Sequence, residues 1–356
     1  MRVGLVAPPW VSVPPRGYGG TETVIDNLAR GLAARGHEVH LFTVGTSTCP
    51  VHRHRLYREP VVPMGRCLAE AAHAIAAYDA LADMEVVHDH TVLGALVATR
   101  RHFPVPVVVT NHGPFDAEAR RVFARIGQEA TVVAISHDQA RRALGVPIGA
   151  VIHHGVDLAA YRPGPGGDAL VFVGRMSPDK GVDRALRIAH AAGRPLHIVA
   201  KMREPDERQY FQAEVRPLLG ADDDLSGELD LPGRIGLLRG AHALVNPIDW
   251  PEPFGMVMIE ALAVGTPVIA FDRGAASEIV TDGVTGCLVA DEAAAVAAVA
   301  RVGRIDRARC RREAEARFSL DRLARDHEAL YRRVVADWPR PVVVQVGGRP
   351  ADRSAR

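Results

Sequence analysis

Short apolar segments alternate with amphipathic stretches along most of the chain, which predicts parallel strands covered on both faces by helices. In the first half, the predicted strands are residues 3–7, 39–44, 86–88, 105–110, 131–135 and 150–153. The helical patterns between them are residues 21–35, 67–81, 92–101, 115–128 and 137–144. This set makes a doubly wound, Rossmann-like α/β domain over residues 1–160.

The second half repeats this architecture after a Pro- and Gly-rich break at residues 161–168, which we interpret as a hinge. Its predicted strands are residues 170–173, 196–200, 243–246 and 268–271. Its predicted helices are residues 182–192, 207–218, 254–264, 293–302 and 307–317. We therefore expect a second domain over residues 169–318, a long helix over 319–338 that packs back on the first domain, and a disordered tail over 339–356.

Composition agrees with this organisation and narrows the function. A chain of 356 residues with 47% hydrophobic and 24% charged residues is typical of a soluble protein of two domains. The net charge of +1 gives no reason to expect a nucleic-acid partner, and no apolar run is long enough to span a bilayer. The N-terminus is too short for a signal peptide and looks like a first strand. The four cysteines are scattered, which predicts a reduced, cytoplasmic protein without structural zinc.

Two doubly wound domains each present a crevice at the carboxyl ends of their strands, and facing crevices form one deep cleft. The stretch 250–270, WPEPFGMVMIEALAVGTPVIA, belongs at this cleft. Pro253 disfavours helix at Glu252, whereas Glu260 follows the helical period. The first amides of that helix favour an anion, so one carboxylate lies beside an anion and the other about 8–12 Å away. This spacing suits a sugar at one end of a diphosphate and a ribose at the other.

A second candidate lies where the first strand of the second domain ends, at Gly174 and Arg175. Lys180 follows five positions after Arg175 and directly precedes a helix. Two cations beside free helix amides can clamp an anion.

The first domain contributes weaker signals to the same cleft. Gly19 and Gly20 precede a helix and let a phosphate or a sugar approach the backbone, although this loop is not a dinucleotide-binding GxGxxG. His112 ends a strand beside Gly113, where it can bind a substrate hydroxyl. Asp89 and His90 end another strand on the acceptor side, but Asp89 can equally be a helix cap. Neither His88-Asp89-His90 nor His153-His154 is expected to bind a metal, because neighbouring strand residues point to opposite faces.

Together these segments resemble the retaining family 4 glycosyltransferases of GT-B fold, and the resemblance covers about residues 1–337. It depends on VGRMSPDKG, on EPFGMVMIEALAVGTPVIA with its E-x7-E spacing, and on VIHHGVDLAAYRP before the hinge. The Gly-Gly loop, TNHG and DRGAASEIVTDGVTGCLV fit the same family.

The resemblance implies a nucleotide-diphosphate sugar as co-substrate, no cofactor, no metal, and a hydroxyl acceptor bound mostly by the first domain. Arg175 and Lys180 would hold the diphosphate, and Glu260 would accept hydrogen bonds from the ribose. The other implied contacts are Glu252 and His112 to the transferred sugar, Gly19, Gly20 and Gly174 near the diphosphate, and backbone amides around Phe254, Gly255 and Met256. The two cations would stabilise the leaving phosphate, with attack on the same face of the sugar.

The sequence also departs from the family pattern. Histidine replaces the usual asparagine at position 154, and the usual Gly-Gly-x-Pro-Glu is reduced to the segment 273–278. Residues 220–233 form an acidic, Gly-containing run without a clear strand, so base recognition stays open, with Ile235 and Leu237 as candidate base contacts.

Other functions remain open from the sequence. A GT-B-fold nucleotide-sugar epimerase would share the fold and the anion clamp, and so would a non-catalytic sugar-nucleotide-binding protein. Peripheral membrane contact through the basic segments 119–125 and 141–142 is a further alternative. The donor base, the sugar and the acceptor are not readable from the residues.

Overall fold

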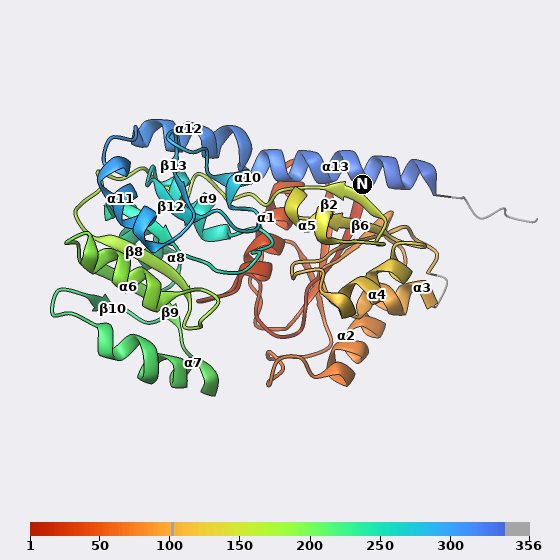
Figure 1. Ribbon diagram of the computed structural model, residues 1–356. Coiled ribbons are helices and arrows are strands. Elements are labelled where there is room, and N and C mark those ends of the chain that lie inside the picture. The colour runs from red at the N-terminus through yellow and green to blue at the C-terminus, as the bar shows by residue number, and fades with distance from the viewer. Residues whose placement is uncertain (101–102, 339–356) are drawn as a thin grey trace, which may run out of the picture.

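The computed structural model describes residues 1–100 and 103–338, which form two α/β domains side by side (Figure 1). The predicted tail at 339–356 and the end of the predicted helix 92–101 lie outside the described residues.

The N-terminal domain is built on a sheet with the strand order β3-β2-β1-β4-β5-β6-β7, in which every described pair is parallel. Its strands are β1 (Arg2–Val6), β2 (Glu38–Thr43), β3 (His52–Arg55), β4 (Val86–Asp89), β5 (Val107–Thr110), β6 (Thr131–Ala134) and β7 (Ile148–Val151). The apolar pattern predicts all of these except β3, whose sequence HRHR contains no apolar residue.

Helices cover both faces of this sheet, as the alternation predicts. They are α1 (Gly20–Ala34), α2 (Cys67–Ala80), α3 (Gly94–Arg100), α4 (Ala117–Ile126) and α5 (His137–Arg142). Residues of α1 fill the core on one face, and residues of α2, α3 and α4 fill the core on the other.

The C-terminal domain has a second all-parallel sheet, in the order β10-β9-β8-β11-β12-β13. Its strands are β8 (Leu170–Arg175), β9 (Leu196–Lys201), β10 (Asp224–Leu225), β11 (Ala243–Asn246), β12 (Val268–Phe271) and β13 (Gly286–Val289). The expectation of four strands was incomplete, because it contained neither β10 nor β13. The acidic run 220–233 does contain a strand, β10, but only two residues of it pair with β9.

The helices of this domain are α6 (Val182–Ala191), α7 (Pro205–Tyr210), α8 (Leu231–Gly240), α9 (Met256–Ala263), α10 (Ala276–Ile279), α11 (Glu292–Val302) and α12 (Arg307–Arg317). The predicted helix 207–218 is α7 continued by a π turn, η1 (Phe211–Val215), and a 3-10 turn, η2 (Arg216–Leu218). The pattern misses α8 because its sequence, LPGRIGLLRG, contains three glycines and a proline.

The last described helix, α13 (Leu320–Asp337), leaves the C-terminal domain and packs on the N-terminal one (Figure 1). Leu323 and Tyr331 enter the core beside α1. Helices α1 and α13 approach each other closely, because a Cβ at Gly31 of α1 would lie 2.9 Å from the Cβ of Ala324 in α13.

The linker around residues 158–168 lies against the C-terminal domain. Arg311 of α12 donates to the carbonyls of Tyr161 and Leu158, and Arg307 donates to that of Gly164. A Cβ at Gly164 would lie 2.2 Å from the carbonyl oxygen of Arg239, so the linker requires glycine at position 164.

In both sheets the strand order reverses in the middle, next to β1 and β8 respectively, which is where ligands bind in open α/β sheets. Among the described residues, no helix is long and apolar enough to cross a membrane.

Candidate active site

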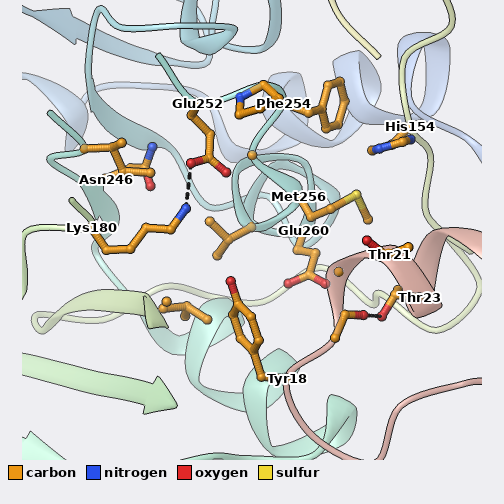
Figure 2. A pocket seen from close by; sticks show the side chains of 18 of the residues that line it. Tyr18, Thr21, Thr23, His154, Lys180, Asn246, Glu252, Phe254, Met256 and Glu260 are labelled. Carbon is orange, nitrogen blue, oxygen red and sulfur yellow. Dashed lines mark hydrogen bonds and ion pairs between the residues drawn. The ribbon is translucent and has the colours of Figure 1, made fainter. Parts of the chain in front are cut away.

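A pocket of about 300 Å³ lies between the two domains at the carboxyl ends of their strands (Figure 2). The N-terminal domain and the linker side contribute residues 17–21, Thr23, His112, Ile135 and His154. The C-terminal domain contributes residues 172–174, Lys180, Arg234, Asn246, Ile248, 252–257 and Glu260. Most of the residues singled out from the sequence therefore meet in one cavity.

Glu252 and Lys180, which both line this pocket, form an ion pair. The Nζ of Lys180 lies 2.6 Å from Oε2 of Glu252 and 5.4 Å from the centre of the Trp250 ring. Figure 2 shows both side chains directed into the cavity. Glu252 lies in the loop before α9, where Pro253 was expected to keep it. Because both side chains are largely buried, the pair brings a fixed cation and a fixed anion to the same point.

The loop that carries Glu252 is supported by a segment from outside the pocket. Gly274 has φ +57°, and a Cβ there would lie 2.3 Å from the carbonyl oxygen of Glu252. The amide of Ala275 donates to that same oxygen over 3.0 Å. The segment that departs from the family pattern therefore acts as the backing of the Glu252 loop, which its sequence does not reveal.

Glu260 has partners for both of its oxygens. Arg234 of α8 donates through Nε and a terminal nitrogen at 3.0 Å each, and the Tyr161 hydroxyl donates over 3.1 Å. The charge of Glu260 raises the pKa of Arg234, although burial opposes it. Bidentate pairing fixes the orientation of the carboxylate.

Arg234 is a pocket residue that the sequence analysis missed, and it corrects one expectation. Ile235 and Leu237 were candidate base contacts, but they pack against the apolar core and are absent from the pocket lining. The sequence signal that could have identified Arg234 is the presence of an arginine in a segment that is otherwise apolar and rich in glycine.

Residues at the start of α9 form the floor of the pocket. Gly255 adopts φ +102°, and a Cβ there would lie 2.5 Å from Cε of Met258. This left-handed residue turns the chain into the helix, so that Met256 and Val257 line the cavity. The first amides of a helix have no intrahelical acceptor, so this end of the pocket favours an anion.

The opposite wall is the loop before α1. A Cβ at Gly20 would meet no atom within 4 Å, so the backbone there is open to a ligand. Thr23 closes the first turn by donating its hydroxyl to the Gly19 carbonyl over 2.8 Å. Next to them, burial raises the pKa of Glu22 to about 7.

His112 lies in the pocket wall and is backed by other histidines. Its Nε2 lies 2.9 Å from Nδ1 of His90, and its ring stacks on that of His154 at 5.3 Å. Burial, followed by the charge of His327, lowers the pKa of His112 to about 3, so the ring is neutral at pH 7.

The surroundings of Nε2 of His90 indicate which ring nitrogens of His90 and His112 carry protons. That Nε2 is buried and has no partner among the described residues. A buried N–H without an acceptor is rarer than a bare acceptor, which favours a proton on Nδ1 of His90. His90 then donates to His112, and the Nδ1–H of His112 is left available as a donor.

Three residues singled out from the sequence lie outside the pocket lining, and one of them is His90, which lies behind His112. Arg175 is absent from the pocket lining and pairs with Asp179 at 2.9 Å, with 39% of its side chain exposed. Asp89 accepts from the amide of Thr91 and the hydroxyl of Tyr78, at 2.7 and 2.6 Å. The geometry therefore favours a structural carboxylate at position 89, which was the alternative.

The clearest basic segment considered for membrane contact is paired internally. Arg141 and Arg142 of α5 lie 3.4 and 2.7 Å from the carboxylate of Asp138.

Comparison with known proteins identifies both domains. Residues 18–160 match the family described as Glycosyltransferase Family 4, and residues 167–304 match Glycosyl transferases group 1. A D-inositol 3-phosphate glycosyltransferase of Kribbella flavida is 30% identical over 353 residues, which cover 79% of this chain and 82% of that protein.

Solved structures agree with this result. A glycosyltransferase involved in avilamycin A biosynthesis has a TM-score of 0.73 at 28% identity, covering 95% of this chain and 99% of that one. Anabaena HepE in complex with UDP-glucose is similar in fold, with a TM-score of 0.72 at 18% identity over 93% of this chain and 99% of that one.

Proposed function

The chain belongs to the family 4 glycosyltransferases and has the GT-B fold, and on this premise we propose that it is a retaining enzyme that uses nucleotide-diphosphate sugars. It moves the sugar to an acceptor hydroxyl without a catalytic metal ion. The observation that carries the proposal is the Lys180–Glu252 pair, which lies in the same pocket as the loop before α9 and the open backbone at Gly20.

The positive charge in this pocket matches the charge that develops in such a reaction. Breaking the bond between the sugar carbon and the phosphate leaves negative charge on the β-phosphate. Lys180 and the first amides of α9 can stabilise that charge in a closed site. Lys180 has three N–H donors, so it can hold Glu252 and a phosphate oxygen together.

The proposed transfer proceeds on one face of the sugar. The acceptor oxygen bonds to the sugar carbon as the phosphate leaves, and the acceptor proton passes to a phosphate oxygen. Glu252 then positions the sugar and stabilises its positive charge, and His112 donates to a sugar hydroxyl from the other domain.

Glu260 is assigned to the ribose. The carboxylate lines the pocket from the middle of α9, eight residues after Glu252, and Arg234 holds it in place. Oε2 of Glu260 accepts one hydrogen bond and has a lone pair left for a ribose hydroxyl, whereas Oε1 already accepts two.

A donor panel tests the proposal. We expect one of UDP-, GDP-, ADP- or dTDP-glucose to raise the unfolding free energy by about 2.7 kcal/mol at a hundred times its Kd. With that donor, D-inositol 3-phosphate is the first acceptor to try, because the name of the Kribbella relative specifies it.

Variants then locate the phosphate contact. Lys180→Ala should lower kcat by about 10²–10³-fold. Arg175→Ala should do the same only if the arginine turns into the pocket when the donor binds. Net epimerisation of the donor without an acceptor, or binding of donors without any transfer, would contradict the proposal in favour of one of the two alternatives.

A further inference from the structure

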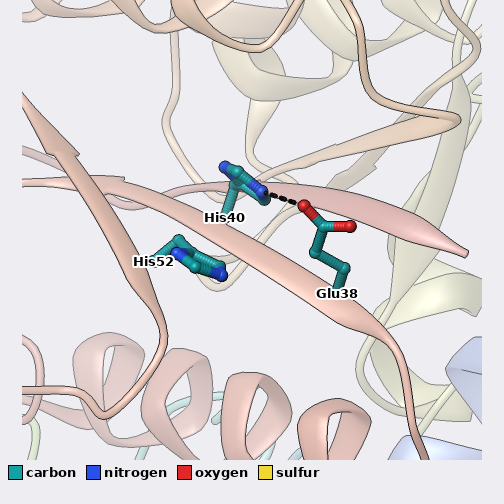
Figure 3. A group of neighbouring side chains, drawn as sticks. All are labelled: Glu38, His40 and His52. Carbon is teal, nitrogen blue, oxygen red and sulfur yellow. Dashed lines mark hydrogen bonds and ion pairs between the residues drawn. The ribbon is translucent and has the colours of Figure 1, made fainter.

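Three side chains with metal-binding chemistry lie on one face at the outer edge of the N-terminal sheet (Figure 3). Glu38 and His40 are two residues apart on β2, so they share a face of the sheet. His52 begins β3, and the parallel register places it directly opposite His40. The backbone pairing, rather than loop conformation, therefore brings the three together.

Their ligand atoms are close enough for one ion. One oxygen of Glu38 and one ring nitrogen from each histidine all lie within 4.8 Å of one another. His40 Nε2 and Glu38 Oε1 are 2.9 Å apart, and the two imidazole rings stack with their centres 4.8 Å apart. A tetrahedral ion with bonds of roughly 2.0–2.1 Å holds its ligand atoms roughly 3.3 Å apart, so small side-chain rotations suffice.

We propose that Glu38, His40 and His52 form a site for a divalent transition-metal ion of the Zn²⁺ type. Imidazole nitrogen with carboxylate oxygen is a donor set that suits zinc, copper and nickel, and it distinguishes this site from the all-oxygen sites of magnesium or calcium. Glu38 and His52 are exposed, so an ion can enter from solvent and keep water as a fourth ligand.

His54 provides the outer support that metal-binding histidines usually have. It follows His52 by two residues on β3, and its Nε2 lies 2.9 Å from Nδ1 of His40. When His40 binds the ion through Nε2, its Nδ1–H donates to His54. Such a partner fixes the ring orientation and the tautomer of the ligand.

The other group of three donors in the described part of the chain lacks this freedom. It consists of His137, His153 and Glu278. The oxygens of Glu278 already accept from the amides of His137 and Asp138 at 2.7 and 2.6 Å, and from His153 at 2.8 Å. A metal ion there would have to displace hydrogen bonds that join the two domains.

The proposed site is separate from the sugar-transfer pocket. Glu38 starts β2, whereas the pocket lies at the carboxyl ends of the strands. A bound ion would join β2 to β3, which is a short edge strand held on one side only. Its effect is therefore on the stability of the N-terminal domain, independently of the transfer reaction.

Calorimetric titration of the full chain, without a histidine tag, with ZnCl₂ tests the proposal. We expect one zinc ion to bind, and His52→Asn to weaken binding at least tenfold. His52 is exposed, and the variant's circular dichroism should match the wild type. His40→Gln should weaken binding at least as much. The matched control is His137→Asn with His153→Asn, which removes the other histidine pair and should leave zinc affinity unchanged.

The outcomes separate clearly. Absence of zinc binding in the wild type, or equal affinity in His52→Asn, would overturn the proposal. Loss of binding only in the His137→Asn, His153→Asn variant would move the site to the domain interface. Anomalous scattering from a zinc-soaked crystal should place the ion between His40 and His52. Failure of this site would leave the proposed glycosyl transfer untouched.

Discussion

At the scale of single residues, the most specific prediction concerns Arg234, the partner of Glu260. We expect Arg234→Gln to cost about 3–5 kcal/mol of stability, because it leaves the buried carboxylate of Glu260 with fewer partners. The KM for the donor should rise more than kcat falls, because the ribose contact is uniform binding and takes no part in bond breaking.

A 2′-deoxyribose donor separates positioning from stability. If Arg234 acts through Glu260 on the ribose, the loss in kcat/KM caused by Arg234→Gln should shrink with that donor. An equal loss with both donors would show that Arg234 is only structural. Arg239→Gln on the same helix, outside the pocket, is the control.

Glu22 predicts a pH dependence of stability. Its pKa is about 7 in the folded protein and close to 4.5 when the chain is unfolded. The folded state therefore binds this proton more tightly, so stability falls as pH rises from about 4.5 through 7. Glu22→Gln removes that penalty and should stabilise the protein by roughly 3 kcal/mol at pH 8, with little effect at pH 4.

Urea unfolding at both pH values measures the difference. Glu118→Gln, at an exposed glutamate in the first turn of α4, is the control and should show no such pH dependence. Equal stabilisation of Glu22→Gln at both pH values would contradict a buried, titrating carboxyl group.

At the scale of elements, the loop before α9 depends on the turn that backs it. Gly274→Ala would place a Cβ 2.3 Å from the carbonyl oxygen of Glu252, so the Glu252 loop must move. A displacement of about 1 Å at a reacting centre costs about 10²-fold in rate, and we expect that loss in kcat.

Gly283→Ala is the control that separates the clash with the Glu252 loop from the cost of a positive φ. Gly283 also has a positive φ, of +71°, but a Cβ there meets nothing within 4 Å. That variant should lose about 1 kcal/mol of stability without loss of activity. Equal activity of the two variants would show that the Glu252 loop does not rely on Gly274.

Most elements with a strong apolar pattern were predicted, although the apolar strand β13 was not, and β3 and β10, which have no such pattern, were missed. The buried strands β1, β5, β11 and β12 follow from runs of Val, Ile, Leu and Ala. The strand β3 consists of His and Arg, and β10 pairs through two residues. Their backbones are held by a neighbouring strand, which is a tertiary cause that no local pattern records.

At the scale of the whole molecule, Glu278 joins the domains. It belongs to α10 of the C-terminal domain, yet it caps α5 of the N-terminal domain and pairs with His153. Burial alone would raise the pKa of Glu278, but hydrogen bonds from His153 and from the amides of His137 and Asp138 lower it. The contact therefore stabilises above the ordinary pKa of a glutamate and weakens as pH falls through the lowered value.

We expect Glu278→Ala to loosen this contact. Amide hydrogen exchange at His137 and Asp138 should accelerate, while the amides of the central strand β8 keep their protection. Glu278→Gln retains an acceptor oxygen, so its exchange rates at His137 and Asp138 should lie between those of the wild type and of Glu278→Ala. Unchanged exchange at His137 in Glu278→Ala would show that other contacts hold the domains together.

The sequence alone determined the two α/β domains and placed Glu252, Lys180, Glu260 and the Gly19-Gly20 loop at one cleft. These features follow from local periodicity and from the rule that parallel strands end at a common edge. The tertiary structure decided the partners of these residues. Arg234 pairs with Glu260, His90 lies behind His112, and Arg175 pairs with Asp179 instead of entering the pocket. Partners depend on distances between segments far apart in the chain, and those distances are set by packing rather than by residue order.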